Sequence, residues 1–175
     1  ALVDDVKGMK IGIPKEFFGE GIKAETRAAI DKAIEFYKKA GAEIIPVSIP
    51  HVKSGVSIYY IIAPAEASSN LAYDGVSYGF RADGDNIVDM YINTRNQGFG
   101  MEVKRRIMLG NYVLSAGYYD AYYKKALKVR RLLKEAFDKA YEQCDVLLAP
   151  SASGTAFKFG AFTDPLALYM EDICT

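Results

Sequence analysis

The chain has 175 residues, and its 22 basic and 22 acidic side chains give no net charge at neutral pH. A neutral chain has no overall field that would draw it onto nucleic acid or an anionic membrane, so such contacts would need a local patch. The two cysteines, Cys144 and Cys174, do not suggest a disulfide scaffold and match no metal-binding spacing. These cysteines favour a reduced, cytoplasmic setting. No apolar run is long enough to span a bilayer.

The first fifty residues predict a βαβ unit. Residues 9–14 alternate between apolar and polar positions and end in a proline, which is typical of a short strand. Residues 26–40 carry apolar side chains at helical spacing, and residues 43–49 read as a second strand. A helix that connects two neighbouring strands normally makes them parallel. Pro46 lacks the N–H that a central strand would donate, so the second strand is expected at a sheet edge or with a bulge.

The middle of the chain is predicted to be mostly helical. Helices are expected over residues 52–71, 86–96, 102–115 and 118–143, with a loop over residues 73–84. Pro64 lies inside the first of these helices and predicts a kink or a break. The apolar residues 145–150 predict a third, buried parallel strand, and a short helical piece is expected near residues 165–171. The expected fold class is α/β, a βαβ unit plus a long helical segment packed on a mixed or parallel sheet, with residues 1–175 forming one partial domain.

Tyrosines and basic residues gather at the start of the longest predicted helix. Tyr118, Tyr119, Tyr122 and Tyr123 recur three and four positions apart, so on a helix they form one aromatic stripe. Lysines and arginines follow. A stripe of this kind is usually a packed helix face with a solvated basic edge. The same pattern also fits a non-catalytic interaction module, in which the stripe and the basic residues contact a protein partner or the phosphates of tRNA.

The residues offer no complete catalytic apparatus. His51 is the one histidine, so a Ser-His or Cys-His arrangement would have to use it, and its place after Pro50 favours a surface or capping role. Ser68 and Ser69 lie in a predicted helix, where hydroxyls usually bond back to the chain. Cys144 is expected to pack as a small side chain rather than to act as a nucleophile. Neither a G-x-S-x-G elbow nor a Walker phosphate loop occurs.

Binding chemistry is better represented. Arg106 could grip a carboxylate through two N–H groups, and Asp172 could hold an ammonium group. With a tyrosine hydroxyl, these two charges would recognise an α-amino acid. The residues alone leave open whether the three groups converge.

Five sequence motifs, in the same order along the chain, resemble the sequences of one protein family. They are Y-Y-I-I-A-P-A-E-A-S-S-N-L (Tyr59–Leu71), Y-D-G-V-S-Y-G (Tyr73–Gly79), T-R-N-Q-G-F-G-M-E-V-K-R-R-I-M-L-G (Thr94–Gly110), L-S-A-G-Y-Y-D-A-Y-Y-K-K-A (Leu114–Ala126) and D-P-L-A-L-Y-M-E-D-I (Asp164–Ile173). The resemblance covers nearly the whole chain. It is to the A subunits of the bacterial glutamyl-tRNA(Gln)/aspartyl-tRNA(Asn) amidotransferases, which belong to the amidase signature family, and it implies an amidase-signature type of α/β fold.

The resemblance also implies an activity for the parent protein. In that family the A subunit hydrolyses glutamine, and the B subunit uses ATP and Mg²⁺ to pass the ammonia to misacylated tRNA, in a complex that includes the C subunit. The product would be Gln-tRNA(Gln) or Asn-tRNA(Asn). The family's catalytic lysine, cis-serine and nucleophilic serine lie in a Gly/Ser-rich region, and this chain has no G-G-S-S-G run. The chain is therefore expected to be a fragment of a larger amidase domain that carries no catalytic residue, binds no metal or other cofactor and is inactive alone.

By the same resemblance, three residues bind the substrate glutamine. The family's glutamine-recognising tyrosine matches Tyr59, its carboxylate-binding arginine matches Arg106, and its amine-binding aspartate matches Asp172. Their role would be proximity, because ion pairs at the α-groups would hold the side-chain amide against a serine supplied elsewhere. A hydrolase of another amide within the same family is the alternative that keeps the enzyme class.

Overall fold

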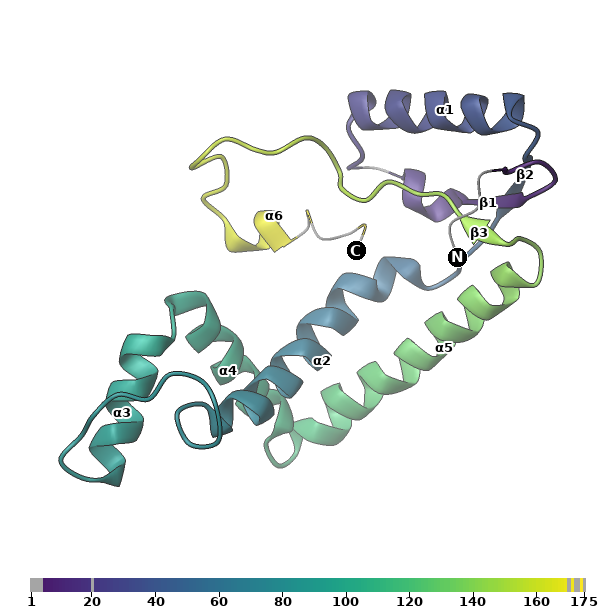
Figure 1. Ribbon diagram of the computed structural model, residues 1–175. Coiled ribbons are helices and arrows are strands. Elements are labelled where there is room, and N and C mark those ends of the chain that lie inside the picture. The colour runs from purple at the N-terminus through teal and green to yellow at the C-terminus, as the bar shows by residue number, and fades with distance from the viewer. Residues whose placement is uncertain (1–4, 20, 170, 172–173, 175) are drawn as a thin grey trace. The chain divides into compact units, whose positions relative to one another are not determined.

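The structure, a computed structural model, describes residues 5–19, 21–169, 171 and 174. A parallel β-sheet and, within the described residues, six α-helices make up the fold, which confirms the predicted α/β class (Figure 1). The chain divides into two compact units. One comprises residues 1–56 and 130–175, and the other comprises residues 57–129.

The first unit is built on a parallel sheet that confirms the predicted βαβ unit. Strand β1 (Lys10–Pro14) pairs with β2 (Glu43–Val47) on one side and with β3 (Val146–Leu147) on the other, both in parallel. Helix α1 (Ala24–Lys39) connects β1 to β2. In the described sheet, whose order is β2-β1-β3, β2 is an edge strand. The edge placement expected from Pro46 is therefore confirmed.

The third strand is shorter and less buried than predicted. Only Val146 and Leu147 pair with β1, and Val146 keeps 40% of its surface exposed. The side chain of Asp145 accepts a hydrogen bond from the backbone N–H of Lys10 at 2.8 Å, at the start of the pairing. Leu148 makes the last backbone bond, to Gly12. The predicted third parallel strand is therefore confirmed, but its predicted length, residues 145–150, and its predicted burial were wrong.

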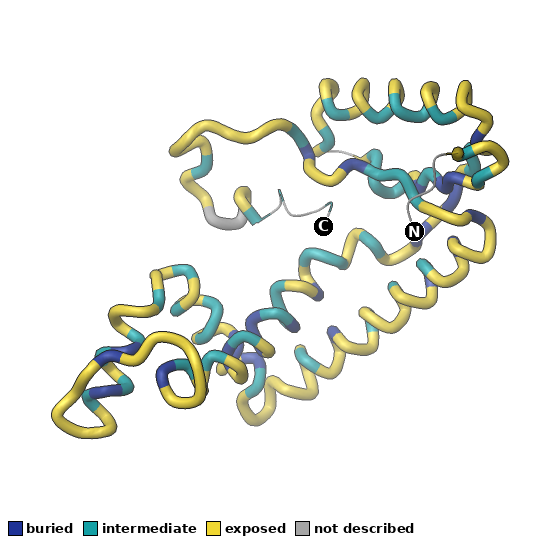
Figure 2. Tube along the Cα trace, viewed as in Figure 1, coloured by how far each residue is buried: buried dark blue, intermediate teal, exposed yellow. Residues whose placement is uncertain are grey.

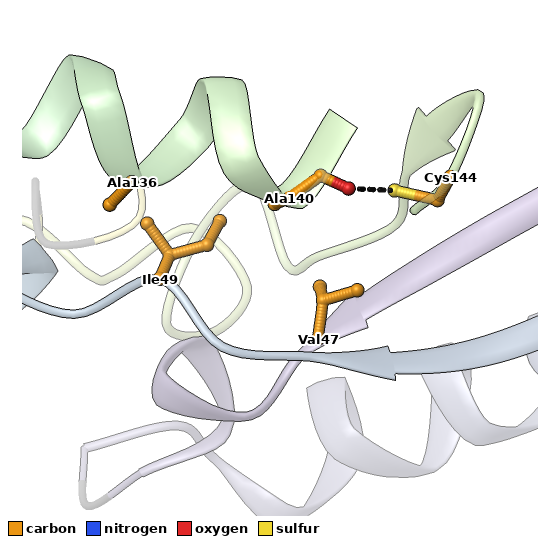
Figure 3. Packing of buried hydrophobic residues seen from close by; sticks show 5 residues of the cluster. All are labelled: Val47, Ile49, Ala136, Ala140 and Cys144. Atoms are coloured by element: carbon orange, nitrogen blue, oxygen red, sulfur yellow. Dashed lines mark hydrogen bonds between the residues drawn. The ribbon is translucent and has the colours of Figure 1, made fainter. Parts of the chain in front are cut away.

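A small hydrophobic core holds helix α5 (Lys124–Tyr141) close to the strand exit after β2. Val47 and Ile49, which is fully buried, pack against Ala136, Ala140 and Cys144 (Figure 3). The three small residues are spaced four apart, so they lie along one helix face and its continuation. Their size lets the backbone of α5 approach the β2 segment closely. Most of the remaining surface of α5 is exposed, as is most of α1 (Figure 2).

Glu16 ties the turn after β1 to this core. It lies in a 3₁₀ turn, Lys15–Phe18, and its carboxylate accepts hydrogen bonds from the Ser48 hydroxyl and from the backbone N–H of Ile49, the latter at 3.0 Å. Partial burial alone would raise the pKa of this carboxyl. The hydrogen bonds from Ser48 and Ile49 outweigh burial and hold the pKa of Glu16 below its ordinary value of 4.5.

We expect Glu16→Gln to cost about 1 kcal/mol of unfolding free energy at neutral pH, because a carboxylate accepts these two bonds better than an amide. A lowered folded-state pKa gives stability that is present above about pH 4.5 and lost as the pH falls through the folded value. The difference between the two proteins should therefore shrink below pH 4.5 in urea unfolding experiments. Glu142→Gln, at an exposed position after α5, is the control. A Glu16→Gln difference that stays constant down to pH 3 would contradict this assignment.

The second unit is helical. It contains most of α2 (Gly55–Asn70), then α3 (Ile87–Gly98), α4 (Met101–Leu114) and the first residues of α5. Ile58 and Ile62 of α2 pack against Ala126 of α5. The helix predicted over residues 86–96 begins with a side-chain cap: Asn86 accepts hydrogen bonds from the N–H groups of Val88 and Asp89.

Pro64 does not break α2, which runs uninterrupted from Gly55 to Asn70, so no break occurs where a kink or a break was predicted. The proline is fully buried. Its carbonyl lies against α4, so close that a Cβ built on Gly110 would stand 2.0 Å from the Pro64 oxygen and 2.6 Å from the Ser68 hydroxyl. The helix thus continues past the hydrogen bond that proline cannot donate, with α4 packed closely against it at this point.

The tyrosine stripe is not the regular helix face that was predicted. Tyr119–Tyr123 form a π-helical turn, and α5 begins only at Lys124. The wider turn sorts the rings into two groups. Tyr118 and Tyr122 stack at 5.9 Å beside Tyr112, and Tyr119 stacks on Tyr123 at 5.3 Å. Of the four residues in the stripe, only Tyr123 packs against the core of this unit, and the other three are exposed.

Candidate functional site

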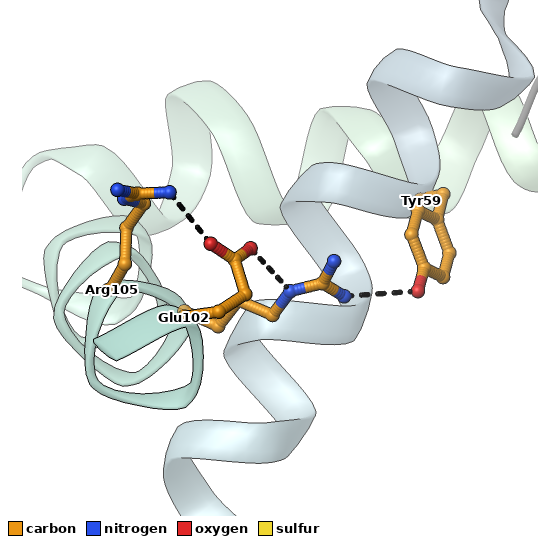
Figure 4. A network of polar contacts seen from close by, with 4 residues as sticks. Tyr59, Glu102 and Arg105 are labelled. Atoms are coloured by element: carbon orange, nitrogen blue, oxygen red, sulfur yellow. Dashed lines mark hydrogen bonds and ion pairs between the residues drawn. The ribbon is translucent and has the colours of Figure 1, made fainter. Parts of the chain in front are cut away.

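Arg106, on α4, is the centre of a polar network in the second unit. Its Nε donates to Glu102 Oε1 at 3.0 Å, and its Nη1 donates to the hydroxyl of Tyr59, on α2, at 3.1 Å (Figure 4). The other carboxylate oxygen of Glu102 pairs with Nη1 of Arg105 at 2.6 Å. The Arg106 side chain is 29% exposed, so it is partly withdrawn from water but still within reach of a ligand.

Two aromatic rings flank the guanidinium. Tyr59 and Tyr60 are neighbours on α2 and their rings meet edge to face, with centroids 4.9 Å apart. Cζ of Arg106 lies 5.3 Å from the ring centroid of Tyr60 and 5.9 Å from that of Tyr59. Contacts of this length between a cation and an aromatic face are favourable and restrict the plane of the guanidinium.

The sequence brings these groups together by matching two helix faces. On α4, Glu102, Arg106 and Gly110 follow one another at intervals of four residues, so they share a face. On α2, Tyr60 and Pro64 are spaced in the same way. Gly110 lies directly on Pro64, one turn beyond the contact of Arg106 with Tyr60. The close approach of the backbones at Gly110 thus sets how near Arg106 stands to the two tyrosines.

Arg106 keeps its positive charge in this network. Burial by itself would lower the pKa of Arg106, but its hydrogen bonds to Tyr59 and Glu102 raise that pKa above its ordinary value, so the guanidinium keeps its charge at every pH at which the protein is folded. Glu102 pairs with both Arg105 and Arg106 through its two carboxylate oxygens. The guanidinium of Arg106, beside the Tyr59 hydroxyl, carries the charge and the N–H donors that suit a carboxylate.

Two of the three substrate-binding residues expected from the sequence thus stand in contact. Tyr59 and Arg106, 47 positions apart in the chain, share a hydrogen bond. Asp172 lies outside the residues that the structure describes. Glu102, Tyr60 and Gly110 were not singled out from the sequence. The four-residue spacing of Glu102 and Arg106 on a predicted helix is the signal that could have found the first of them.

The other chemically notable side chains have structural roles. Cys144 is buried, its Sγ contacts the carbonyl of Ala140 at 3.2 Å, and burial raises the pKa of its thiol, so it is not an activated nucleophile. The hydroxyls of Ser68 and Ser69 donate to the carbonyl of Ala65, as expected for helix serines. His51 is exposed and precedes a 3₁₀ turn without a capping hydrogen bond from its side chain, in line with the surface alternative of the expectation.

The described residues include no group of three or more histidine, cysteine, aspartate or glutamate side chains that could hold a metal ion. A polar depression does lie beside the start of α3. It is lined by Asp83, Gly84, Asp85, Asp89 and Asn93.

In the described part of the chain, no helix combines the length and the apolar character needed to cross a membrane.

Comparison with known proteins gives one consistent result. The sequence profile of the Amidase family matches residues 2–175. The chain is 56% identical over 176 residues to the A subunit of the glutamyl-tRNA(Gln) amidotransferase of Pelagibacter ubique, and 57% identical over 177 residues to that of Carboxydothermus hydrogenoformans. Each alignment covers 99% of this chain and 36% of the relative, so the chain spans about a third of the length of the curated relatives it matches.

Solved structures agree with the sequence relatives. The A subunit of the glutamyl-tRNA(Gln) amidotransferase of Thermotoga maritima superposes with a TM-score of 0.68 at 40% identity, over 97% of this chain and 32% of that protein. A bacterial aryl acylamidase of the amidase signature family superposes with a TM-score of 0.66 at 17% identity, over 90% of this chain and 30% of the other, which shows a shared fold alone.

Proposed function

The chain belongs to the amidase family, and from that premise we propose that it is the substrate-recognition part of the glutamine-hydrolysing A subunit of a tRNA-dependent amidotransferase. The relatives that match it over almost its whole length are, by name, A subunits of glutamyl-tRNA(Gln) amidotransferases. The observation that carries the proposal is the contact between Arg106 and Tyr59. The family resemblance assigns both residues to the binding of free glutamine, and Arg106 Nη1 lies 3.1 Å from the Tyr59 hydroxyl oxygen.

The proposed chemistry is a clamp on the two α-groups of glutamine. Arg106 binds the α-carboxylate, for which its charge and its fork of N–H donors are suited. Asp172 binds the α-ammonium group. With both ends held, the side-chain amide is presented to a nucleophilic serine that another part of the parent protein supplies, and hydrolysis gains from the fixed geometry.

The Tyr59 hydroxyl has a defined hydrogen-bond direction in this clamp. Its oxygen accepts a hydrogen bond from Arg106 Nη1, so the hydroxyl's own hydrogen points elsewhere. We assign that hydrogen to an acceptor oxygen of glutamine. Tyr59 would then link the guanidinium to the substrate, which also explains why a tyrosine and not a phenylalanine occupies a position that is 45% exposed.

In this proposal the chain works within a larger assembly. Ammonia released from glutamine is delivered to the B subunit, which uses ATP and Mg²⁺ to amidate a misacylated tRNA, and the C subunit completes the complex. The chain's own residues contribute glutamine recognition, whereas ATP, Mg²⁺ and tRNA are bound mainly by the partners. Glu-tRNA(Gln) or Asp-tRNA(Asn) is the acceptor of the ammonia.

Tyr59→Phe tests the proposed role of the hydroxyl. We expect the KM for glutamine to rise about tenfold, which corresponds to the loss of one hydrogen bond to a charged or polar substrate group. The kcat should change little, because the ring and its packing stay in place. The measurement is steady-state release of glutamate by the full-length protein with its partner subunits. Tyr119→Phe, at an exposed ring in the π-helical turn, is the matched control. Equal KM values for the two variants would argue against the proposed site.

A further inference from the structure

We propose that Glu102 is the residue that positions Arg106 for substrate, an inference that rests on the proposed function. Glu102 lies in the first turn of α4, one turn before Arg106, and 44% of its side chain is exposed. It holds Arg106 through Nε and so takes no part in the contact with Tyr59. No role in glutamine binding is assigned to it by the family resemblance.

Two hydrogen bonds from different nitrogens restrain the guanidinium. Glu102 Oε1 holds Nε, and the Tyr59 hydroxyl holds Nη1. A guanidinium is planar and rigid, so two hydrogen bonds from different nitrogens define both its plane and its rotation about the last side-chain torsion. If the Glu102 bond were absent, that torsion would depend more on Tyr59 and on the contact with the Tyr60 ring, and the ring contact fixes a face but not a direction.

Glu102 also separates two adjacent arginines. One carboxylate oxygen serves Arg106 and the other serves Arg105, whose side chain is 56% exposed. The carboxylate therefore offsets one of the two positive charges on this turn of α4. Pairing through separate oxygens keeps the guanidinium of Arg106 at a defined position, which suits recognition of an α-carboxylate.

The position of Glu102 in the helix supports a pre-formed arrangement. An acidic side chain in the first turn interacts favourably with the helix dipole, and a glutamate followed four residues later by an arginine is the favourable orientation of an ion pair along a helix. Both effects hold the carboxylate in place before substrate arrives. Binding then costs less ordering of the arginine side chain.

The first test is Glu102→Ala in the full-length protein with its partner subunits. We expect the KM for glutamine to rise about tenfold with kcat nearly unchanged, because the arginine keeps its charge but loses its orientation. Glu102→Gln should restore most of the affinity, since its amide oxygen can still accept from Nε. An unchanged KM in Glu102→Ala would overturn the proposal. A Glu102→Gln variant as weak as Glu102→Ala would also overturn it, because charge alone would then be responsible.

A matched control is present in α5. Arg131 Nε pairs with Glu135 Oε1 at 3.0 Å, four residues apart, the same distance and spacing as the pair of Arg106 with Glu102. Glu135→Ala removes a helix ion pair that has no place in the proposed site. Because acid and base stand in the reverse order in this control pair, and Glu102 also pairs with Arg105, we expect Glu135→Ala to lose less thermal stability than Glu102→Ala. Only Glu102→Ala should raise the KM. A rise of the same size in both would show a merely structural effect and would overturn the proposal.

The same experiment separates this inference from the proposed function. Arg106→Gln is measured alongside Glu102→Ala. If Arg106→Gln raises the KM strongly and Glu102→Ala does not, Glu102 is not the positioning residue and the glutamine clamp stands. If neither variant changes the KM, the clamp itself is wrong, and with it the role given to Glu102.

Discussion

Arg106→Gln is expected to raise the KM for glutamine about 100-fold, which corresponds to roughly 2.8 kcal/mol of lost binding free energy. Glutamine at this position can still meet a carboxylate with one N–H group, but it has no charge and no fork of donors. It also leaves the Glu102 carboxylate and the Tyr59 hydroxyl without the cation that both contact. Steady-state glutaminase assays of the full-length protein measure the effect.

Two further variants make this result specific. Arg106→Lys keeps the charge and loses the planar fork, so its KM should lie between those of the wild type and Arg106→Gln. Arg130→Gln removes an exposed arginine of α5 and should leave the KM within about twofold, as most surface substitutions do. A KM in Arg106→Gln that matched Arg130→Gln would show that Arg106 does not bind the substrate.

Gly110→Ala is expected to destabilise the protein by about 3 kcal/mol, the upper end of the range for overpacking a closely packed contact. The added Cβ would stand 2.0 Å from the carbonyl oxygen of Pro64 and 2.6 Å from the Ser68 hydroxyl. The first of these atoms is backbone in a helix and cannot rotate away. Either α4 moves off α2 or the pair of helices loses its packing.

Gly55→Ala is the control for this effect, because a Cβ at Gly55 would meet nothing within 4 Å and its φ of −57° is helical. That variant should be neutral or slightly more stable. Urea unfolding gives both free energies. Where Gly110→Ala still folds, its KM for glutamine should also rise, since Gly110 sets the distance of Arg106 from the tyrosines. Equal stability of the two alanine variants would contradict the packing described for α2 and α4.

Patterns in the sequence correctly predicted the elements of the fold that depend on residues close together in the chain. The alternation in residues 9–14 and the helical spacing in residues 26–40 are properties of one element each, and a short connection between neighbouring strands leaves few arrangements open. Pro46 likewise indicated an edge strand, because proline has no N–H to donate to a neighbouring strand.

The misplaced elements depend on contacts that no local pattern records. The π-helical turn at Tyr119–Tyr123 shares its spacing signal with an ordinary helix, so periodicity could not indicate that α5 begins only at Lys124. Pro64 is a helix breaker by its own chemistry, and α2 continues through it in the presence of α4 packed against its carbonyl. After Asp145, residues 146–150 are apolar enough for a longer strand, yet only Val146 and Leu147 pair with β1 in the strand register.

The candidate site likewise contains one contact that depends on helix packing and one that is local in the sequence. Sequence periodicity could not predict the contact between Tyr59 and Arg106, because residues 47 positions apart meet only through the packing of two helices. Only the motifs shared with the family suggested that the two residues act together. The pairing of Glu102 with Arg106 is local and could have been found from their spacing. Whether Asp172 joins them stays a prediction, since it lies outside the described residues.

The central claim is that Arg106 binds the α-carboxylate of glutamine, and glutaminamide, in which that carboxylate is a neutral amide, tests it most directly. The ratio of kcat/KM for glutamine to that for glutaminamide is measured in the wild type and in Arg106→Gln. We expect the wild type to prefer glutamine by about 100-fold and the preference almost to disappear in the variant, because the variant lacks the positive charge that distinguishes a carboxylate from an amide. An equal preference in both proteins would show that a group other than Arg106 recognises the carboxylate.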